Sequence, residues 1–186
     1  RFVQAMAQAD RHQTRIALVY LDLDNFKTIN DTLGHAAGDE LLREVARRLR
    51  ESVRDSDTIS RQGGDEFLLM LGELSDTEVV AAVVLKIMDR LQEPVRIGTQ
   101  ELSVSASIGV AIGPEDGRDF ETLRKKADMA MYRSKEAGRN AYHFFDPTMD
   151  AEAGEHLLMR NGLRRALERD EFLLHYQPST TWPADS

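Results

Sequence analysis

A near-continuous apolar run, RIALVYL at 15–21, is the feature that most limits how this chain can fold. The run is bounded by charge and is far shorter than the roughly 20 apolar residues that a membrane span needs. An apolar stretch of this length without alternation is typical of a strand that is buried on both faces. We therefore expect this segment to lie in the middle of a sheet.

The composition is that of an ordinary globular protein. The 186 residues correspond to about one domain with some chain to spare. A net charge of −8 argues against binding a nucleic-acid polymer or an anionic membrane, although a local basic pocket for one nucleotide remains compatible with it. The chain has no cysteine, which excludes disulfides and thiolate metal sites and fits the reducing cytoplasm. Both ends look cut, so we expect a fragment of a longer protein, and a membrane anchor upstream would be compatible with it.

The remaining elements follow from apolar spacing and from glycine and proline positions. They predict an N-terminal helix, a short helix that ends at Gly34, two strands joined at Gly63-Gly64 and a helix that Gly138 ends. The other predicted elements are a helix at 39–53, a helix at 78–91, strands within 95–112 and a last strand at 141–145. This order predicts an α/β fold of ferredoxin-like, palm type, with a largely antiparallel sheet flanked by helices. Beyond 146 a polar linker leads to a predicted helix at 157–172 and a strand at 173–178.

Acidic residues gather where this fold would bring chain ends together. Asp22 and Asp24 are two apart at the end of the first strand, and therefore on one face. The fold pairs that strand with the one leaving the glycine turn, which places Asp22 near Asp65. Carboxylates so close repel one another unless a cation neutralises them, and hard oxygen ligands suit Mg²⁺. Gly63 and Gly64 would let a phosphate or base approach the backbone. A solvated turn with exposed acids is the alternative.

The stretch RQGGDEF (61–67) resembles the signature of the GGDEF family, the diguanylate cyclases. Three further segments, DLDNFKTINDTLGHAAGDELL, SASIGVAI and KADMAMYRSKEAGRNAY, are similar to other blocks of that family. The tail GLRRALERDEFLLHYQP resembles the start of an EAL phosphodiesterase domain, but it contains none of that domain's catalytic residues. The resemblance divides the chain into a GGDEF domain lacking its extreme N-terminus at 1–146, a linker at 147–161 and a truncated EAL start at 162–186.

The resemblance implies a reaction in which two GTP molecules condense to cyclic di-GMP and release two pyrophosphates. Each 3′-hydroxyl attacks the α-phosphate of the other GTP, so two domains must face each other as a homodimer. Two Mg²⁺ (or Mn²⁺) ions per site would neutralise phosphate charge. An EAL domain would follow in the parent protein.

The family's site residues transfer onto matching positions. The resemblance assigns Asp22, Asp65 and the Leu23 carbonyl to the metal, and makes Glu66 a further ligand or a base for the 3′-hydroxyl, on the Gly63-Gly64 hairpin. It gives Asp24 no clear metal role. The guanine would be recognised by Asn30 and Asp39, and the rest of GTP by Phe26, Lys27, Lys135 and Arg139. The RxxD pattern RDSD (54–57) would bind inhibitory product through Arg54 and Asp57, with Arg61 nearby.

Several of these residues also have a structural explanation that needs no ligand. Asp39 after a glycine is also typical of a helix N-cap, and Lys135 and Arg139 complement the dipole at a helix end. A lone RxxD is usually a surface ion pair. For the whole chain, the main alternative is an inactive module that binds GTP or cyclic di-GMP and regulates an attached EAL domain. A different nucleotidyl-transfer enzyme on the same kind of sheet is a second alternative.

Overall fold

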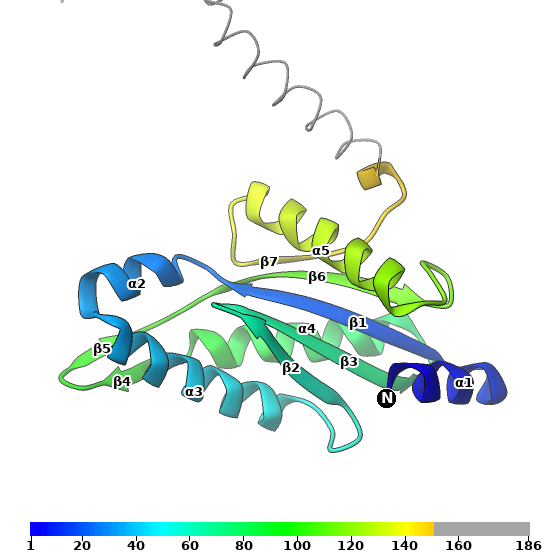
Figure 1. Cartoon of the computed structure of the whole chain (residues 1–186), viewed down its shortest axis with the longest axis horizontal. Coiled ribbons are helices and arrows are strands. Elements are labelled where there is room, and N and C mark those ends of the chain that lie inside the picture. Colours follow the sequence, from blue (N-terminus) through cyan, green and yellow to red (C-terminus); the bar gives the residue numbers. More distant parts are fainter. Residues whose placement is uncertain (151–186) are drawn as a thin grey trace, which may run out of the picture. The chain divides into compact units, whose positions relative to one another are not determined.

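Two sheets form the framework of the protein, for which a computed structural model describes residues 1–150. The strands are β1 (Arg15–Leu23), β2 (Thr58–Gly63), β3 (Glu66–Leu74), β4 (Val95–Ile97), β5 (Gln100–Leu102), β6 (Ala106–Gly113) and β7 (Ala141–Phe144). Five of them form one sheet in the order β2-β3-β1-β6-β7, and β4 and β5 pair separately (Figure 1). Within the large sheet β6 and β7 run parallel, and every other pair is antiparallel.

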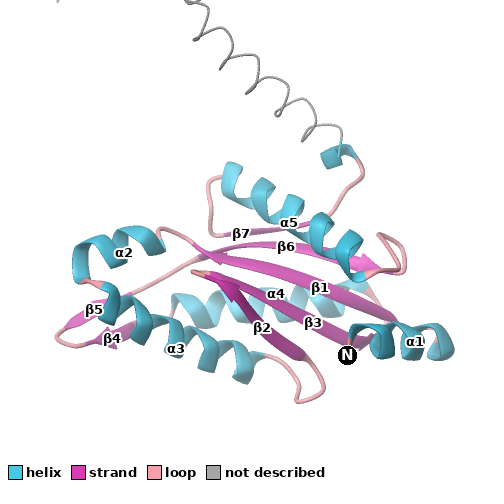
Figure 2. Ribbon diagram, viewed as in Figure 1, coloured by secondary structure: helices cyan, strands magenta, loops and turns pink. Residues whose placement is uncertain are grey.

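Within residues 1–150, five helices lie around the large sheet (Figure 2). They are α1 (Phe2–His12), α2 (Phe26–Leu33), α3 (His35–Ser52), α4 (Thr77–Gln92) and α5 (Phe120–Glu136). None of the helices within residues 1–150 is long and apolar enough to cross a membrane. The fold confirms the predicted α/β palm-type arrangement of a mixed sheet flanked by helices.

Strand β1 is the central strand, as its apolar sequence predicts. It pairs with β3 on one side and β6 on the other, and every residue from Ile16 to Leu23 is buried. Ala17, Val19 and Leu21 belong to a core cluster with residues of α3 and α4. The alternate residues Ile16 and Leu18 belong to a second cluster with residues of α1 and α5. One face of β1 therefore packs with α3 and α4, and the other face packs with α1 and α5.

Several element boundaries differ from the sequence prediction. Helix α3 begins at His35 instead of Asp39, so that Gly38 lies inside the helix. The stretch LSVSASIGVAI does not form one strand, because β5 ends at Leu102 and β6 begins at Ala106. The hairpin turn falls one residue late, since β2 includes Gly63 and β3 starts at Glu66. The predicted linker and EAL start at 147–186 lie almost wholly outside the described residues.

Helix α5 packs directly on β6 at Gly109. A Cβ added to Gly109 would lie 2.0 Å from the Ala127 carbonyl oxygen and 2.1 Å from the Met131 backbone nitrogen. These are backbone atoms, which cannot move without moving the helix. The missing side chain at Gly109 thus sets how closely α5 approaches the sheet.

Gly109→Ala is expected to lower the free energy of unfolding by about 3 kcal/mol, the upper range for overpacking a core, because α5 must move away from β6. Urea unfolding of the whole chain measures this change. The matched control is Gly72→Ala, where an added Cβ has nothing within 4 Å and the expected change is under about 1 kcal/mol. Equal unfolding midpoints for the two variants would contradict this account of the packing.

Candidate functional site

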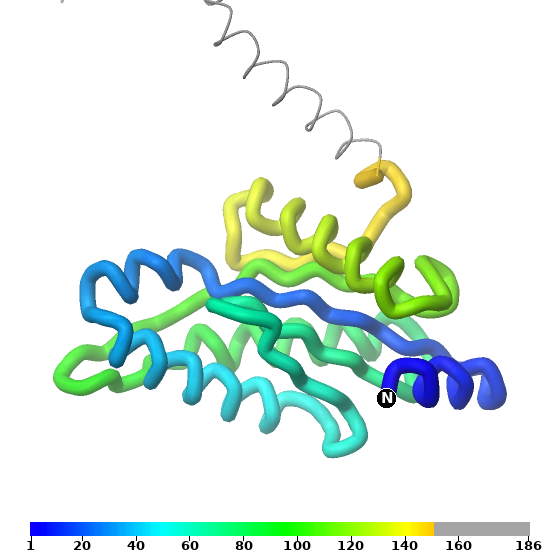
Figure 3. The backbone as a smooth tube through the Cα atoms, in the orientation of Figure 1, coloured from blue at the N-terminus to red at the C-terminus, as the bar shows by residue number. Residues whose placement is uncertain are grey.

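Acidic residues converge where β1 ends beside the β2–β3 hairpin. Asp22 is the register partner of Glu66 across the antiparallel pair. The backbone N–H of Leu23 donates to the carbonyl oxygen of Asp65 at 3.3 Å. Figure 3 shows the tip of the hairpin beside the C-terminal end of β1. The predicted proximity of Asp22 and Asp65 is therefore present in the fold.

The Asp22 carboxylate is buried among like charges and one cation. Its side chain is only 11% exposed, and Lys135 Nζ lies 2.7 Å from its Oδ2. Burial raises the pKa of Asp22, the Lys135 ammonium opposes that rise, and Asp65 and Glu66 add to it. The position thus favours a neutralising cation, and the lysine supplies that charge here.

The same residues fit a hard divalent cation. The carboxylates of Asp22, Asp65 and Glu66 and the carbonyl of Leu23 are all oxygen donors, which Mg²⁺ prefers. Within residues 1–150 no group of three His, Cys, Asp or Glu side chains is close enough to hold a metal unaided. Mg²⁺ commonly takes only one or two carboxylates and completes its shell with water and substrate phosphate. The donor set therefore fits a cation that arrives with a phosphate.

Two residues beside Glu66 were missed from the sequence. Tyr20 Oη donates to Glu66 Oε2 at 3.2 Å. The pKa of Asp128, an exposed residue of α5, is raised by partial desolvation and then by the nearby charge of Glu66. Both could have been found from spacing, since Tyr20 shares a strand face with Asp22 and Asp128 lies seven residues before Lys135 on one helix face.

Asp24 does not join the other acids, contrary to the strand-face prediction. Its carboxylate accepts hydrogen bonds from Ser105 Oγ at 2.6 Å, Ser107 Oγ at 2.7 Å and the Asn140 backbone N–H at 3.0 Å. The residue is buried, at 5% exposed. Asp24 follows the end of β1 at Leu23, where strand alternation no longer applies. It ties the end of β1 to the start of β6 and to the segment that follows α5.

The last turn of α5 and the turn that follows it carry two of the predicted phosphate-binding cations, Lys135 and Arg139. Lys135 lies in the last turn of α5, and its ion pair with Asp22 gives it a role beyond complementing the helix dipole. Arg139 and Asn140 have positive φ angles of 66° and 45°, and Arg139 is exposed. The hydrogen bond from the Asn140 N–H to Asp24 stabilises this turn and thereby positions the backbone of Arg139.

The predicted guanine residues lie on two consecutive helices. Phe26 is buried at the start of α2, Lys27 is exposed and Asn30 is half-buried. Asp39 is exposed on α3, whose N-cap is Gly34, so the alternative that Asp39 caps this helix is wrong. Asp39 lines a groove of about 340 Å³ together with Leu42, Arg43, Ala46, Arg50, Ile59, Arg61 and Phe67.

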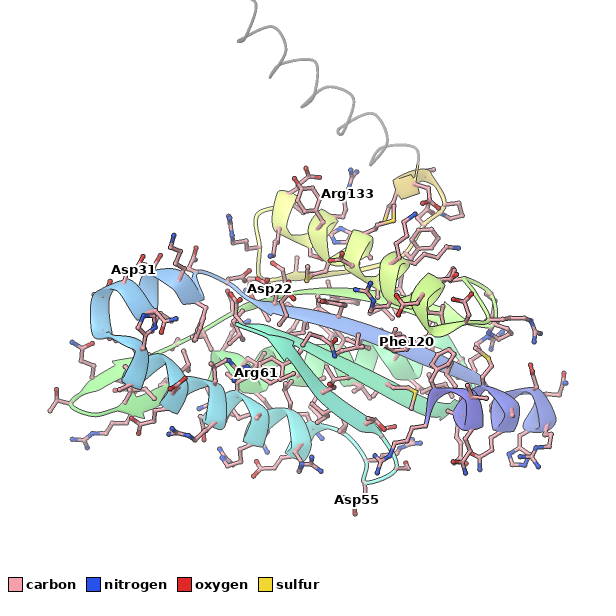
Figure 4. All side chains as sticks on the ribbon, in the orientation of Figure 1. Asp22, Asp31, Asp55, Arg61, Phe120 and Arg133 are labelled. Carbon is pink, nitrogen blue, oxygen red and sulfur yellow. The ribbon has the colours of Figure 1, made fainter. Side chains whose placement is uncertain are left out.

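The predicted product-site residues divide between two grooves. Arg54 and Asp57 line one of about 430 Å³, with Lys86 and an apolar wall from β3 and α4. Asp57 accepts from the backbone N–H of Arg54 at 2.9 Å and from that of Gly72 at 3.2 Å. Arg61 lines the other groove, and its guanidinium donates to the Gly64 carbonyl at 2.9 and 2.8 Å. Figure 4 shows Arg61 and Asp55, of the loop before β2, at opposite ends of that strand.

Comparison with known proteins gives one consistent result. The family described as "Diguanylate cyclase, GGDEF domain" matches residues 1–141. The bifunctional diguanylate cyclase/cyclic di-GMP phosphodiesterase MucR of Pseudomonas aeruginosa is 46% identical over 98% of this chain and 27% of its own length. The cyclic di-GMP phosphodiesterase PdeR of Escherichia coli is 41% identical over 96% of this chain and 26% of its own. The chain thus spans about a quarter of these relatives.

Solved structures agree with the sequence matches. The GGDEF domain of TpbB (YfiN) from Pseudomonas aeruginosa superposes with a TM-score of 0.76 at 37% identity, covering 78% of this chain and 91% of that one. The GGDEF domain of DgcB from Caulobacter crescentus, solved in complex with c-di-GMP, has a TM-score of 0.68 at 30% identity, covering 77% and 85%.

Asp24→Ala is expected to lower the free energy of unfolding by about 3 kcal/mol, because it leaves the buried Ser107 hydroxyl and the Asn140 N–H without their acceptor. Asp24→Asn, whose amide oxygen still accepts hydrogen bonds, should lower the free energy of unfolding by less. Urea unfolding measures both. Asp89→Ala, an exposed position on α4, is the control and should change little. A loss for Asp24→Ala no larger than the control's would refute the tethering role.

Proposed function

Because the chain belongs to the diguanylate cyclase GGDEF-domain family, we propose that it condenses two GTP molecules into cyclic di-GMP and pyrophosphate. The observation that supports this proposal most is the meeting of Asp22, Asp65 and Glu66 where β1 and the hairpin pair, with the Lys135 ammonium already on Asp22. Carboxylates and a lysine at the edge of a sheet are suited to a triphosphate with its metal.

The family resemblance supports a role for each of these residues. Asp22, Asp65 and the Leu23 carbonyl would hold Mg²⁺ or Mn²⁺, two ions per site. When bound, these ions would neutralise phosphate charge and lower the pKa of the ribose 3′-hydroxyl. Lys27, Lys135 and Arg139 would hold the phosphates, so that Lys135 exchanges its contact with Asp22 for one with the substrate.

The 3′-oxygen of one GTP forms a bond to the α-phosphorus of the other, the bond from that phosphorus to the β-phosphate oxygen breaks, and pyrophosphate leaves. Glu66 would accept the hydroxyl proton or act as a further metal ligand, and the bond from Tyr20 Oη orients its carboxylate. Two such transfers close the ring, so two copies of the chain must face each other.

Recognition of the base and of the product would use separate surfaces. Asn30 and Asp39 would bind guanine, because a carboxylate accepts from its N1–H and N2–H₂ groups, a donor pattern that adenine lacks. The groove with Arg54 and Asp57 would bind cyclic di-GMP and inhibit the enzyme. Arg guanidinium groups pair well with phosphate and with the guanine edge.

A second candidate function is a module that binds nucleotide without catalysis and regulates an attached EAL phosphodiesterase domain. The relative named as a phosphodiesterase, PdeR, favours this reading. The presence of Gly63, Gly64, Asp65 and Glu66 together favours catalysis.

Incubation of the chain with GTP and Mg²⁺ is expected to yield cyclic di-GMP at a rate per chain that rises with protein concentration, as a dimeric reaction requires. Asp65→Ala should reduce that rate about 100-fold or more, the usual effect of removing one electrostatic contact to a reacting phosphoryl group. Asp89→Ala is the matched control and should keep the full rate. Chromatography of the nucleotides provides the measurement. Bound GTP without any product at high protein concentration would favour the regulatory module.

Arg54→Ala is expected to weaken binding of cyclic di-GMP about tenfold, the typical loss for one charge-assisted contact. Calorimetric titration with cyclic di-GMP measures this affinity. Arg61→Ala, in the other groove, should have a smaller effect on the same titration. A larger loss for Arg61→Ala than for Arg54→Ala would place the product beside the hairpin instead.

A further inference from the structure

Gly38 lies where the two helices of the proposed guanine site meet. It is buried in the first turns of α3, and the backbone N–H of Gly34, before that helix, bonds to the Asn30 carbonyl in the last turn of α2. A Cβ built on Gly38 would lie 1.9 Å from Asn30 Oδ1 and 3.0 Å from its Cγ. It would also lie 3.2 Å from Cζ of Phe26. The Asn30 amide thus occupies the space that any side chain at 38 would need.

Backbone conformation does not explain this glycine. Gly38 is not among the glycines with positive φ, and it sits inside a helix, where glycine is less stable than alanine. The helix therefore loses stability at this position, and the close approach of the Asn30 amide is what a glycine allows there.

We propose that Gly38 is a positioning residue that fixes the orientation of the Asn30 amide and thereby the preference for guanine over adenine. This inference rests on the proposed function, in which Asn30 contacts the base. An amide whose oxygen packs against the Gly38 backbone has little freedom to rotate, so its polar atoms are already oriented before the nucleotide binds. Preorganised polar groups discriminate strongly between bases, because the wrong base leaves them without partners.

The atom that conflicts with a new Cβ is the far end of a flexible side chain. Gly38→Ala can therefore be accommodated when Asn30 changes rotamer and the Phe26 ring moves by a few tenths of an ångström. The variant is expected to fold and to melt no lower than wild type, since alanine favours the helix. The change should appear instead in nucleotide binding, which separates positioning from a structural role.

The experiment measures the affinities of the whole chain for Mg²⁺-GTP and Mg²⁺-ATP by calorimetric titration. Gly38→Ala is expected to bind GTP about tenfold more weakly and to leave ATP binding unchanged, so that the ratio of the two affinities falls about tenfold. Asp89→Ala, at an exposed position on α4 that lines neither groove, is the control. Its GTP and ATP affinities should equal those of wild type.

A double-mutant cycle with Asn30→Ala tests whether the effect passes through Asn30. Without the Asn30 amide, the added Cβ at position 38 has space, so Gly38→Ala should cost less than twofold in GTP affinity in that background. A tenfold loss that persists in the Asn30→Ala background, or wild-type selectivity in Gly38→Ala, would overturn the inference. A wild-type chain that binds no GTP would overturn the proposed function itself and this inference with it.

Discussion

The antiparallel register between β1 and β3 is the constraint on which the candidate site depends. It sets Asp22 opposite Glu66 and brings the Leu23 N–H to the Asp65 carbonyl, so acids from two distant parts of the chain meet at the end of β1. A slip of one residue would turn the side chains of β1 to the opposite faces of the sheet. The two core clusters on the faces of β1 oppose such a slip, because each set of apolar side chains would meet the wrong helices. Hydrophobic packing thus fixes the position of the charges.

Two contacts from the C-terminal end of α5 and the turn after it complete that arrangement. Lys135 binds Asp22 directly, and Asp24 binds the Asn140 backbone after the same helix. Gly109 allows α5 to lie close enough to β6 for both contacts. The cations proposed to hold phosphate are therefore positioned by the same strand end that presents the proposed metal ligands. Asp24 contributes to this positioning although it lies outside the proposed reaction.

Much of the fold and the central part of the site were predictable from local sequence. The apolar run of β1, the glycine hairpin and the helical stripes depend on nearest-neighbour patterns, and they gave the central strand and the proximity of Asp22 to Asp65. The predictions that were wrong or missing concerned features that tertiary contacts determine. The start of α3 was placed too late because a buried Gly38 looks like a helix breaker until its contact with Asn30 is seen. Strand alternation could not show that Asp24 follows the end of β1 and accepts from two serines, or that Arg61 donates to the Gly64 carbonyl and lines a different groove from Arg54.

The central claim is that the acids at the end of β1 and on the β2–β3 hairpin hold a divalent cation together with a guanine nucleotide. Electron paramagnetic resonance of Mn²⁺, titrated with the chain and a non-hydrolysable GTP analogue, tests it most directly, because free Mn²⁺ gives a signal that bound Mn²⁺ largely loses. The account predicts that the analogue promotes Mn²⁺ binding to wild type, and that Asp22→Asn and Asp65→Asn each weaken it about tenfold, as the loss of one charged ligand would. Equal Mn²⁺ binding by all three proteins, or binding that the analogue does not promote, would contradict it.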